Sequence, residues 1–307
     1  MKNLAKNKKL IYIIIILVIS LVSAVFGLDN YDKIFEGDSP LETTETAETQ
    51  SEQLEVHYID VGQGDCILII CDGETMLIDA GENGNETKVL DYLRVKNVQK
   101  LDYIIASHQH TDHIGGLPEV LDEFGAVNLI MPRLTKEQTP TNRTYTAFLN
   151  SIKNSGAKVI ASEVGATYTL GSATFEILGP VTNKVEDINS MSVIVKLTYG
   201  ENTFLFTGDA EKDEERSVIA TGADLDCDVL KVGHHGSGTS SCTDFLKAVT
   251  PEICVIQVGA DNDYGHPHEN IVERLGKYAD DIYRNDLCGD IVITSDGINL
   301  DVTYENQ

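Results

Sequence analysis

The sequence predicts an α/β protein in which two layers pack together, each layer being a β-sheet covered by helices. Short runs rich in Val, Ile and Leu alternate with helical stretches along most of the chain. This alternation occurs in both halves, and both halves also contain strand-like runs in direct succession. A composition of 42% hydrophobic and 23% charged residues is ordinary for a globular protein. We therefore expect two sheet-plus-helix layers, with the helices outside.

The first half of the folded region begins with two strand-like runs that are separated by the turn Gly62-Gln63-Gly64. The expected strands of this half occupy residues 54–61, 65–71, 76–81, 101–107, 127–132 and 158–162. The expected helices occupy residues 85–97, 113–125 and 141–156. Asp112 is available as the cap near the start of the second helix, and Gly156 ends the third.

The second half continues the pattern and ends in a hairpin. The expected strands occupy residues 167–171, 174–180, 192–200, 202–210, 227–233 and 252–259, and the hairpin 289–297 with 299–305. The expected helices occupy residues 213–222, 241–250 and 268–279.

Residues 10–28 form an apolar run of 19 residues without a charge, preceded by four lysines and followed by Asp29. As a helix this run would span about 28 Å, close to the thickness of a bilayer core. Because lysines stay on the cytoplasmic side, the rest of the chain should lie outside the cell. We interpret residues 1–28 as an uncleaved signal anchor, which predicts a single-pass membrane protein. A cleaved signal peptide, which would leave the protein secreted, and a buried core helix are the alternatives.

Residues 29–54 are polar, acidic and poor in aromatic side chains, so we expect a disordered tether. The remaining residues, 55–307, are long enough for one large domain. From residue 29 onward, 19 basic residues stand against 49 acidic ones, a formal charge of −30. This acidity disfavours non-specific binding of DNA, because phosphate contacts need Lys and Arg. The six cysteines show no CxxC spacing, and buried thiols are the simpler expectation, although an even count permits disulfides.

The segment SHQHTDH carries the strongest chemical signal in the chain. It directly follows the expected buried strand 101–107, so its side chains should gather at the end of that strand. His108 and His110 should point to one side, whereas Asp112 and His113 should face a second point. Imidazole and carboxylate groups suit zinc, iron or manganese. Two such pairs within six residues predict a centre with two divalent metals.

Further candidates follow other expected strands. Asp209 ends the strand 202–210, where its carboxylate can bridge two metals or cap the next helix. His234 and His235 follow the strand 227–233, and we expect their side chains to diverge, so that one binds metal and the other contacts substrate or donates a proton. His266 follows the strand 252–259 and is a ligand or a substrate contact.

Two further histidines are interpreted as lying outside the site. His57 lies within a strand and is interpreted as structural, and His268 lies near the start of a helix and is interpreted as solvated.

These motifs resemble the metallo-β-lactamase fold hydrolases. The resemblance begins with HxHxDH after a strand, an Asp-Ala-Gly strand end at residues 79–81 and a Thr-Gly-Asp strand end at residues 207–209. The finer motifs DVGQGD, GDAE, LKVGHHGS and YGHP, at residues 60–65, 208–211, 230–237 and 264–267, are similar to the C-terminal hydrolase domain of the ComEC competence proteins and its free-standing relatives. The resemblance covers about residues 55–300.

The resemblance implies a four-layer αβ/βα sandwich with its site along one sheet edge, here after the N-terminal membrane helix. It implies a metal-ligand set, a set of catalytic groups, supporting carboxylates and substrate contacts. These are the ligands His108, His110, Asp112, His113, Asp209, His235 and His266, the catalytic residues Asp112, His234 and His235, the supporting Asp79 and Asp60, and the substrate contacts Gln63, Ser237 and Asn189. Asp79 could otherwise be a turn residue, and Ser237 could belong to a plain flexible loop.

One feature departs from many members of this fold family. They carry another ligand histidine between HxHxDH and the bridging Asp, but no histidine lies between His113 and Asp209 here. Asn189 stands about where that histidine would be. This puts in doubt the metal site formed by His108, His110 and Asp209, which would need water or a histidine of the HHGS motif as a further ligand.

The function expected from these residues is metal-dependent hydrolysis outside the cell by a metal-bound hydroxide. The resemblance favours a phosphodiester: DNA, a teichoic-acid-like polymer or a choline-phosphate ester. Zinc is the expected metal, with manganese as the alternative. A β-lactam or lactone hydrolase and a non-catalytic surface binding module are the competing hypotheses. The ComEC resemblance also implies a functional link to DNA uptake, in which this chain could not itself be the many-helix channel.

Overall fold

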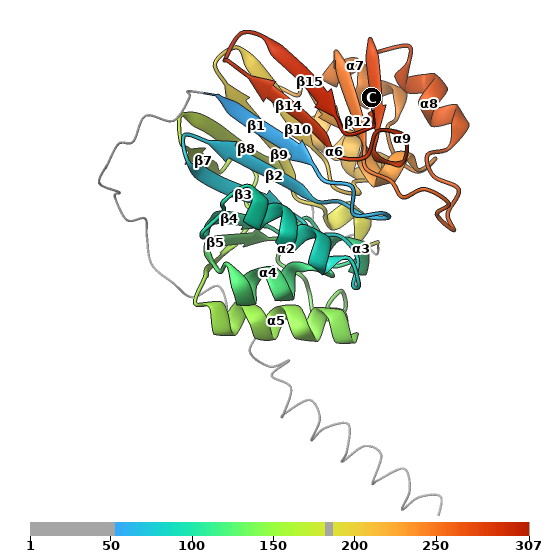
Figure 1. Cartoon of the computed structure of the whole chain (residues 1–307). Coiled ribbons are helices and arrows are strands. Elements are labelled where there is room, and N and C mark those ends of the chain that lie inside the picture. Colours follow the sequence, from blue (N-terminus) through green and yellow to red (C-terminus); the bar gives the residue numbers. More distant parts are fainter. Residues whose placement is uncertain (1–52, 182–186, 307) are drawn as a thin grey trace, which may run out of the picture. The chain divides into compact units, whose positions relative to one another are not determined.

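Two β-sheets pack face to face, and helices cover the outer face of each sheet (Figure 1). This is a computed structural model, and it describes residues 53–181 and 187–306. The predicted α/β architecture with two sheet-plus-helix layers is confirmed. The predicted anchor at 1–28 and almost all of the predicted tether lie outside the described residues. Within the described ranges, no helix has the length and apolar character needed to cross a bilayer.

The first sheet has eight strands in the order β15-β14-β1-β2-β3-β4-β5-β6. Its pairs are antiparallel from β15 to β3 and parallel from β3 to β6. Its strands are β1 Leu54–Tyr58, β2 Ile67–Cys71, β3 Glu74–Ile78, β4 Leu101–Ile105, β5 Ala126–Met131, β6 Lys158–Ala161, β14 Ile291–Ser295 and β15 Leu300–Tyr304. The helices of this half are α2 Glu86–Val95, α3 Thr111–Ile114, α4 Leu117–Glu123 and α5 Arg143–Ser155.

The second sheet has seven strands in the order β13-β12-β11-β10-β9-β8-β7. The four strands from β13 to β10 run parallel, and the pairs from β10 to β7 are antiparallel. Its strands are β7 Thr167–Leu170, β8 Ala173–Gly179, β9 Ile194–Tyr199, β10 Asn202–Phe206, β11 Val229–Lys231, β12 Ile253–Ile256 and β13 Asp281–Arg284. The helical elements are η2 Asn189–Met191, α6 Lys212–Thr221, η3 Gly233–Gly236, α7 Thr243–Val249, α8 Glu269–Leu275 and α9 Asn285–Cys288.

Strand alternation builds two of the apolar cores. Phe204 and Phe206 on β10 belong to the core between the two sheets, which also receives residues from β1, β2 and β14. Leu205, between them, faces the other way and packs with side chains of α6, α7 and α8. Successive side chains of a strand point to opposite faces, so this sheet is buried on both sides.

The predicted single helix at 113–125 is wrong: the structure has two short helices, α3 and α4, with Gly115 and Gly116 between them. A Cβ atom on either glycine would collide with backbone atoms of the turn at residues 80–83. His110, rather than the predicted Asp112, occupies the N-cap position of α3. At the break, Gly116 N–H donates to the carbonyl oxygen of Gly81 (3.3 Å), and Ala80 N–H donates to that of His113 (2.8 Å), so His113 lies next to the end of β3.

Strand β13 was not predicted from the sequence. It is short, has charged residues at both ends and pairs with β12 at the edge of the sheet. The cysteine prediction is confirmed: all six are free, and five of them are buried. The loops that follow β3, β4, β10, β11 and β12 all carry residues of the candidate site described next. These are loops at carboxyl ends of strands, where α/β sheets usually bind ligands.

Candidate metal centre

Asp79 anchors the segment 107–113, which carries the histidines, through hydrogen bonds. It directly follows β3, has a left-handed backbone (φ 58°) and is fully buried. Its carboxylate accepts hydrogen bonds from the backbone N–H of Ser107 (2.8 Å) and from Nδ1 of His113 (2.8 Å). Burial raises the pKa of Asp79, and the positive charge of His113 opposes this rise. A proton fixed on Nδ1 of His113 leaves Nε2 directed toward the site.

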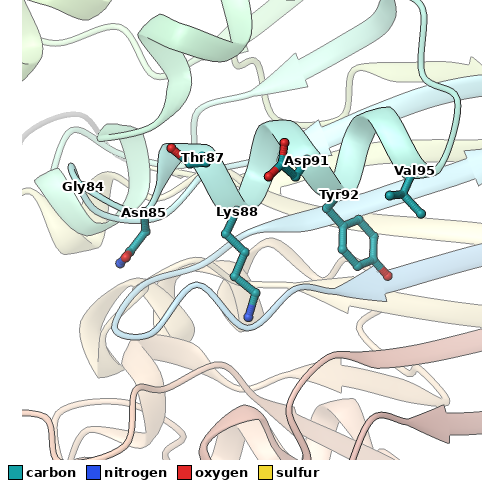
Figure 2. Close-up of a pocket in the computed structure, with 7 residues that line it drawn as sticks. All are labelled: Gly84, Asn85, Thr87, Lys88, Asp91, Tyr92 and Val95. Carbon is teal, nitrogen blue, oxygen red and sulfur yellow. The ribbon is translucent and has the colours of Figure 1, made fainter.

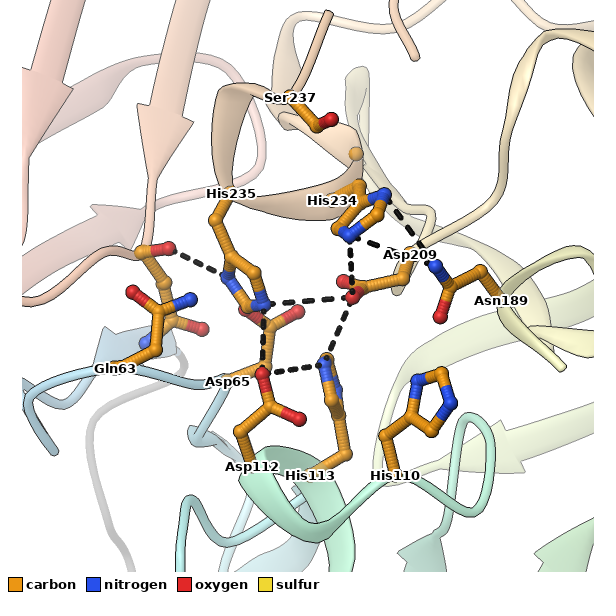
Figure 3. A network of polar contacts seen from close by, with 12 residues as sticks. Gln63, Asp65, His110, Asp112, His113, Asn189, Asp209, His234, His235 and Ser237 are labelled. Carbon is orange, nitrogen blue, oxygen red and sulfur yellow. Dashed lines mark hydrogen bonds and ion pairs between the residues drawn. The ribbon is translucent and has the colours of Figure 1, made fainter. Parts of the chain in front are cut away.

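Four side chains converge at the ends of β4, β10 and β11 (Figure 3). Oδ2 of Asp209 lies 3.2 Å from Nε2 of His113 and 3.4 Å from Nε2 of His235. Oδ2 of Asp112 lies 3.3 Å from Nε2 of His235 and 3.9 Å from Nε2 of His113. Two imidazole nitrogens and two carboxylates within such distances can bind one divalent metal ion.

The donor atoms of this cluster fit a metal. Nε2 of His113, Nε2 of His235 and Oδ1 of Asp209 are buried and have no hydrogen-bond partner, which is rare for polar atoms unless something else binds them. On both histidines Nδ1 is already engaged, on His113 by Asp79 and on His235 by the carbonyl oxygen of Gln257 (2.8 Å). Both Nε2 atoms are therefore free to coordinate.

The electrostatics of the cluster also favour a cation. Burial alone would lower the pKa of His113, but the carboxylates of Asp209 and Asp112 outweigh it and raise that pKa well above its usual value. The same balance raises the pKa of His235. Burial opposes ionisation of Asp209, yet the two histidines hold its pKa well below the usual range. The cluster thus attracts positive charge, either protons or a metal ion.

His108 and His110 flank this cluster, and His108 approaches the same carboxylate. Nε2 of His108 lies 3.1 Å from Nδ1 of His110 and 3.9 Å from Oδ2 of Asp209. His108 is fully buried, and burial lowers its pKa well below the usual value, so its ring is held neutral, the form that binds metals. The structure therefore brings together the residues predicted for a second metal position, with Asp209 between the two groups.

His234 and His235 do not diverge as predicted. They lie in the turn η3 rather than at the end of a strand, and both have left-handed backbone conformations, with φ of 49° and 53°. Nε2 of His234 lies 3.7 Å from Oδ2 of Asp209, against 3.4 Å for His235. The two residues differ in burial instead: the side chain of His235 is 1% exposed and that of His234 is 20% exposed.

An open cavity of about 390 Å³ lies over the cluster. It is lined by Gln63, His110, Thr111, Asp112, Asn189, Asp209, His234, His235, Tyr264 and His266. The predicted substrate contacts Gln63 and Asn189 thus lie at the cavity, as does His266. Burial and the charge of His234 lower the pKa of His266 to about 4, and its Nδ1 is buried without a hydrogen-bond partner.

Two predicted residues lie elsewhere. The carboxylate of Asp60 accepts a hydrogen bond from Gly62 N–H and lies 3.6 Å from Lys88, so it supports its own turn rather than a ligand. Ser237 is 5% exposed and its hydroxyl pairs with Thr239. It is therefore bound within the HHGS turn and does not line the cavity among the residues that the structure describes.

The remaining two histidines have structural contacts, as predicted for His57. Its ring is buried on the outer face of β1, where Nδ1 lies 3.1 Å from the hydroxyl of Tyr92. His268 occupies the N-cap position of α8, and its Nδ1 accepts a hydrogen bond from Gly238 N–H (2.7 Å). It is thus half-buried and bonded, rather than solvated as predicted.

Lys231 and Asp65 form a buried contact beside the cluster that was not predicted from the sequence. Nζ of Lys231 lies 2.6 Å from Oδ2 of Asp65, and both side chains are buried. Oδ1 of Asp65 lies 3.4 Å from Nδ1 of His235. A lysine within the otherwise apolar part of the expected strand 227–233 is the signal that could have revealed this pair, because a buried lysine needs a counter-charge.

A second hollow runs along α2 (Figure 2). It is a shallow groove of about 590 Å³ lined by Gly84, Asn85, Thr87, Lys88, Asp91, Tyr92 and Val95. Its lining contains no histidine or cysteine, and Lys88 lies within ion-pair distance of Asp60 and Asp290. We assign no chemistry to this groove.

The fold and the cluster define the class of protein. Residues 59–259 match the model of the metallo-beta-lactamase superfamily, so the chain belongs to that superfamily. The recognition made from the sequence motifs is thus confirmed. The metallo-beta-lactamase fold protein YhfI of Bacillus subtilis has a similar fold, with a TM-score of 0.50 and 17% identity over 76% of this chain and 96% of that one.

Within this superfamily, the chain is similar in sequence to proteins named for competence. The chain is 26% identical to ComE operon protein 3 of Bacillus subtilis over 259 residues, which cover 78% of this chain and 33% of that protein. It is 32% identical to Competence protein ComA of Neisseria gonorrhoeae over 232 residues, which cover 75% of this chain and 30% of that protein. The chain thus spans about a third of the length of these relatives, which agrees with the predicted likeness to the hydrolase domain of ComEC proteins.

Proposed function

We propose that this chain is a metal-dependent hydrolase that cleaves a phosphodiester. The observation that carries the proposal is a buried set of unpaired metal-type donor atoms at the floor of an open polar cavity. Divalent metals bound there would acidify a coordinated water and neutralise charge on phosphoryl oxygens. Zinc or manganese is the proposed metal, and two ions per chain are proposed, with Asp209 between them.

The residues around the cluster have separable roles. His113, His235, Asp112 and Asp209 would hold one metal, and His108 with His110 would hold the second against Asp209. His266 faces the same cavity, where it would complete a metal site or contact substrate. Asp79 anchors His113 and the Gln257 carbonyl oxygen anchors His235, so these two buried ligands have fixed positions before substrate binds.

His234 is suited to proton transfer. Its side chain is partly exposed at the cavity, and its Nδ1 lies 3.3 Å from Oε1 of Glu211. A carboxylate at Nδ1 fixes the ring and leaves Nε2 toward Asp209 and the cavity, where it can deliver a proton to a leaving oxygen. The Asn189 amide, 3.5 Å from the His234 ring, and that of Gln63 can hydrogen-bond substrate oxygens.

The similarity to Competence protein ComA supports a link to DNA uptake, and DNA is therefore one proposed substrate. The formal charge of −30 from residue 29 onward weighs against long nucleic acids and favours a smaller or locally bound phosphodiester, such as a teichoic-acid-like or choline-phosphate ester. A β-lactam or lactone is the alternative substrate for the same cluster.

The purified protein tests these alternatives directly. Metal content should be measured first, and hydrolysis of bis-p-nitrophenyl phosphate, a phosphorylcholine ester, single-stranded DNA and a β-lactam should be measured in parallel. Metal-dependent turnover of the phosphodiesters supports the proposal. Turnover of the β-lactam alone would contradict the phosphodiesterase proposal and favour a β-lactam or lactone hydrolase. Tight metal binding with no turnover of any substrate would favour a non-catalytic binding module.

We also propose that the protein is held in the cell membrane through residues 10–28, with the domain outside, or is secreted after cleavage. External protease should release the domain from intact cells by cutting within 29–54. Release into the medium without protease would favour the signal peptide. A domain protected from external protease would contradict both arrangements.

A further inference from the structure

Lys231 occupies a position where strand alternation calls for an apolar side chain. On β11, Val229 belongs to the core between the sheets and Leu230 to the core beneath the helices, so Lys231 again points between the sheets. Its side chain is 0% exposed, and Nζ donates to the carbonyl oxygen of Val232 (3.0 Å) and contacts Asp65 at 2.6 Å. Replacing such a pair with apolar residues often leaves stability unchanged or raises it, so stability alone does not explain its presence.

Asp65 connects this lysine to the metal cluster. It lies between β1 and β2, and its backbone N–H donates to the carbonyl oxygen of Asp112 (3.2 Å). Its own carbonyl oxygen accepts a hydrogen bond from Gly81 N–H (2.8 Å). Gly64, just before it, passes so close to the Asp112 carbonyl that a side chain there would collide. Asp65 is thus fixed against the loops that carry Asp112 and Asp79.

The side chain of Asp65 reaches the opposite half of the molecule. Oδ1 lies 3.4 Å from Nδ1 of His235, whereas the other ring nitrogen, Nε2, faces Asp112 and Asp209. Nδ1 of His235 donates to the Gln257 carbonyl oxygen, with the Asp65 charge beside that bond. The Gln257 side chain in turn donates to the carbonyl oxygens of Ile59 and Cys66, on either side of the loop that carries Asp65.

We infer that Lys231 and Asp65 form a positioning pair for the metal centre: Lys231 fixes the Asp65 carboxylate behind His235, and that carboxylate keeps Nε2 of His235 aimed at the metal. The pair joins the second sheet to the first at the point where ligands from both sheets meet. The inference rests on the metal-binding part of the proposed function. It concerns orientation of a ligand, and neither residue contacts the substrate cavity among the described residues.

The test measures zinc affinity and thermal unfolding separately. Variants Asp65→Asn, Lys231→Met and the double variant should be compared with Lys196→Met, which removes another lysine of the same sheet whose Nζ pairs with Asp224 at 2.8 Å. Zinc affinity is measured by competition with a chromophoric chelator, and unfolding is measured in the presence of excess chelator. Loss of an outer partner of a metal ligand lowers affinity by about 10- to 100-fold.

We expect Asp65→Asn and the double variant to bind zinc about 10- to 100-fold more weakly, while Lys196→Met binds like the wild type. Lys231→Met leaves Asp65 buried without a counter-charge, and Asp65→Asn does the same to Lys231, so both single variants should be destabilised. The double variant should regain stability without regaining affinity. Wild-type affinity in Asp65→Asn or in the double variant would overturn the inference. Failure of the wild type itself to bind zinc or manganese would overturn the proposed function instead.

Discussion

Oδ2 of Asp209 lies 3.2 Å from Nε2 of His113, although the two side chains come from loops that follow strands of different sheets. The same oxygen lies within 4.0 Å of ring nitrogens of His108, His234 and His235. The Asp209 carboxylate therefore lies near four of the six histidines around the site, and only His110 and His266 are not among them. The metal centre depends on the sandwich being assembled, because neither half holds the full donor set.

The first prediction concerns this shared carboxylate. Asp209→Asn keeps the size of the side chain but removes its charge, so it should lower the occupancy of both metal positions. Metal content per chain, measured after dialysis against a fixed free-metal concentration, checks this. Full retention of both ions would show that Asp209 does not lie between them.

The second prediction separates the two halves of the HxHxDH segment. His110→Ala and Asp112→Ala should each reduce phosphodiesterase turnover by more than the roughly 10- to 100-fold that outer partners contribute, because each removes a direct ligand. Turnover should be measured on protein that remains folded by circular dichroism. His57→Ala is the control, since His57 lies on the outer face of β1 and contacts Tyr92. Full turnover in His110→Ala would remove the second metal position from the mechanism.

Regular periodicity explains why so much of the fold could be predicted. Strands such as Asn202–Phe206 and helices such as Arg143–Ser155 carry their pattern in adjacent residues, and Gly156 marks a helix end with its left-handed conformation. The strand Asp281–Arg284 could not be predicted, because its pairing with β12, rather than apolar residues, makes it a strand. The break between α3 and α4 depends on contact with residues 80–83, which are distant in sequence.

The candidate site could be predicted only as far as residue type allows. His108, His110, Asp112, His113 and Asp209 are metal-type residues at strand ends, and the structure brings them together. The orientation of His234 and His235 was predicted wrongly, since the residue letters do not reveal that both backbones are left-handed. The contact between Lys231 and Asp65 joins residues that are distant in the sequence, so no local sequence pattern predicts it.

The third prediction concerns pH and stability. Glu214 on α6 is buried, accepts a hydrogen bond from Val181 N–H, and has a second carboxylate oxygen without a partner. Burial raises the pKa of Glu214 to about 7. The folded protein therefore holds a proton on Glu214 that the unfolded chain releases near its ordinary pKa of 4.5, so this contribution to stability is present below pH 4.5 and is lost as the pH rises to 7.

Glu214→Gln should consequently unfold at a higher temperature than the wild type at pH 8, and the difference should shrink toward zero at pH 4.5. Thermal melts in excess chelator measure this difference without the contribution of bound metal. Asp213→Asn is the matched control, because the Asp213 side chain is 89% exposed on the same helix. A difference between Glu214→Gln and wild type that does not change with pH would contradict the prediction.

The fourth prediction distinguishes His234 from His235, which are adjacent in the chain and both near Asp209. His235 is buried, its Nδ1 is fixed by Gln257, and its Nε2 faces Asp112 and Asp209, so His235→Ala should lose metal and, with it, turnover. His234 is partly exposed and its Nδ1 faces Glu211, so His234→Ala should keep its metal and lose rate.

The loss of rate in His234→Ala should be largest for substrates with poor leaving groups and smaller for p-nitrophenyl esters, because a leaving group of low pKa needs no proton donor. Metal analysis and turnover on both substrate types measure these differences. If His234→Ala loses metal as His235→Ala does, His234 is a ligand, and proton transfer must be assigned to another group at the cavity.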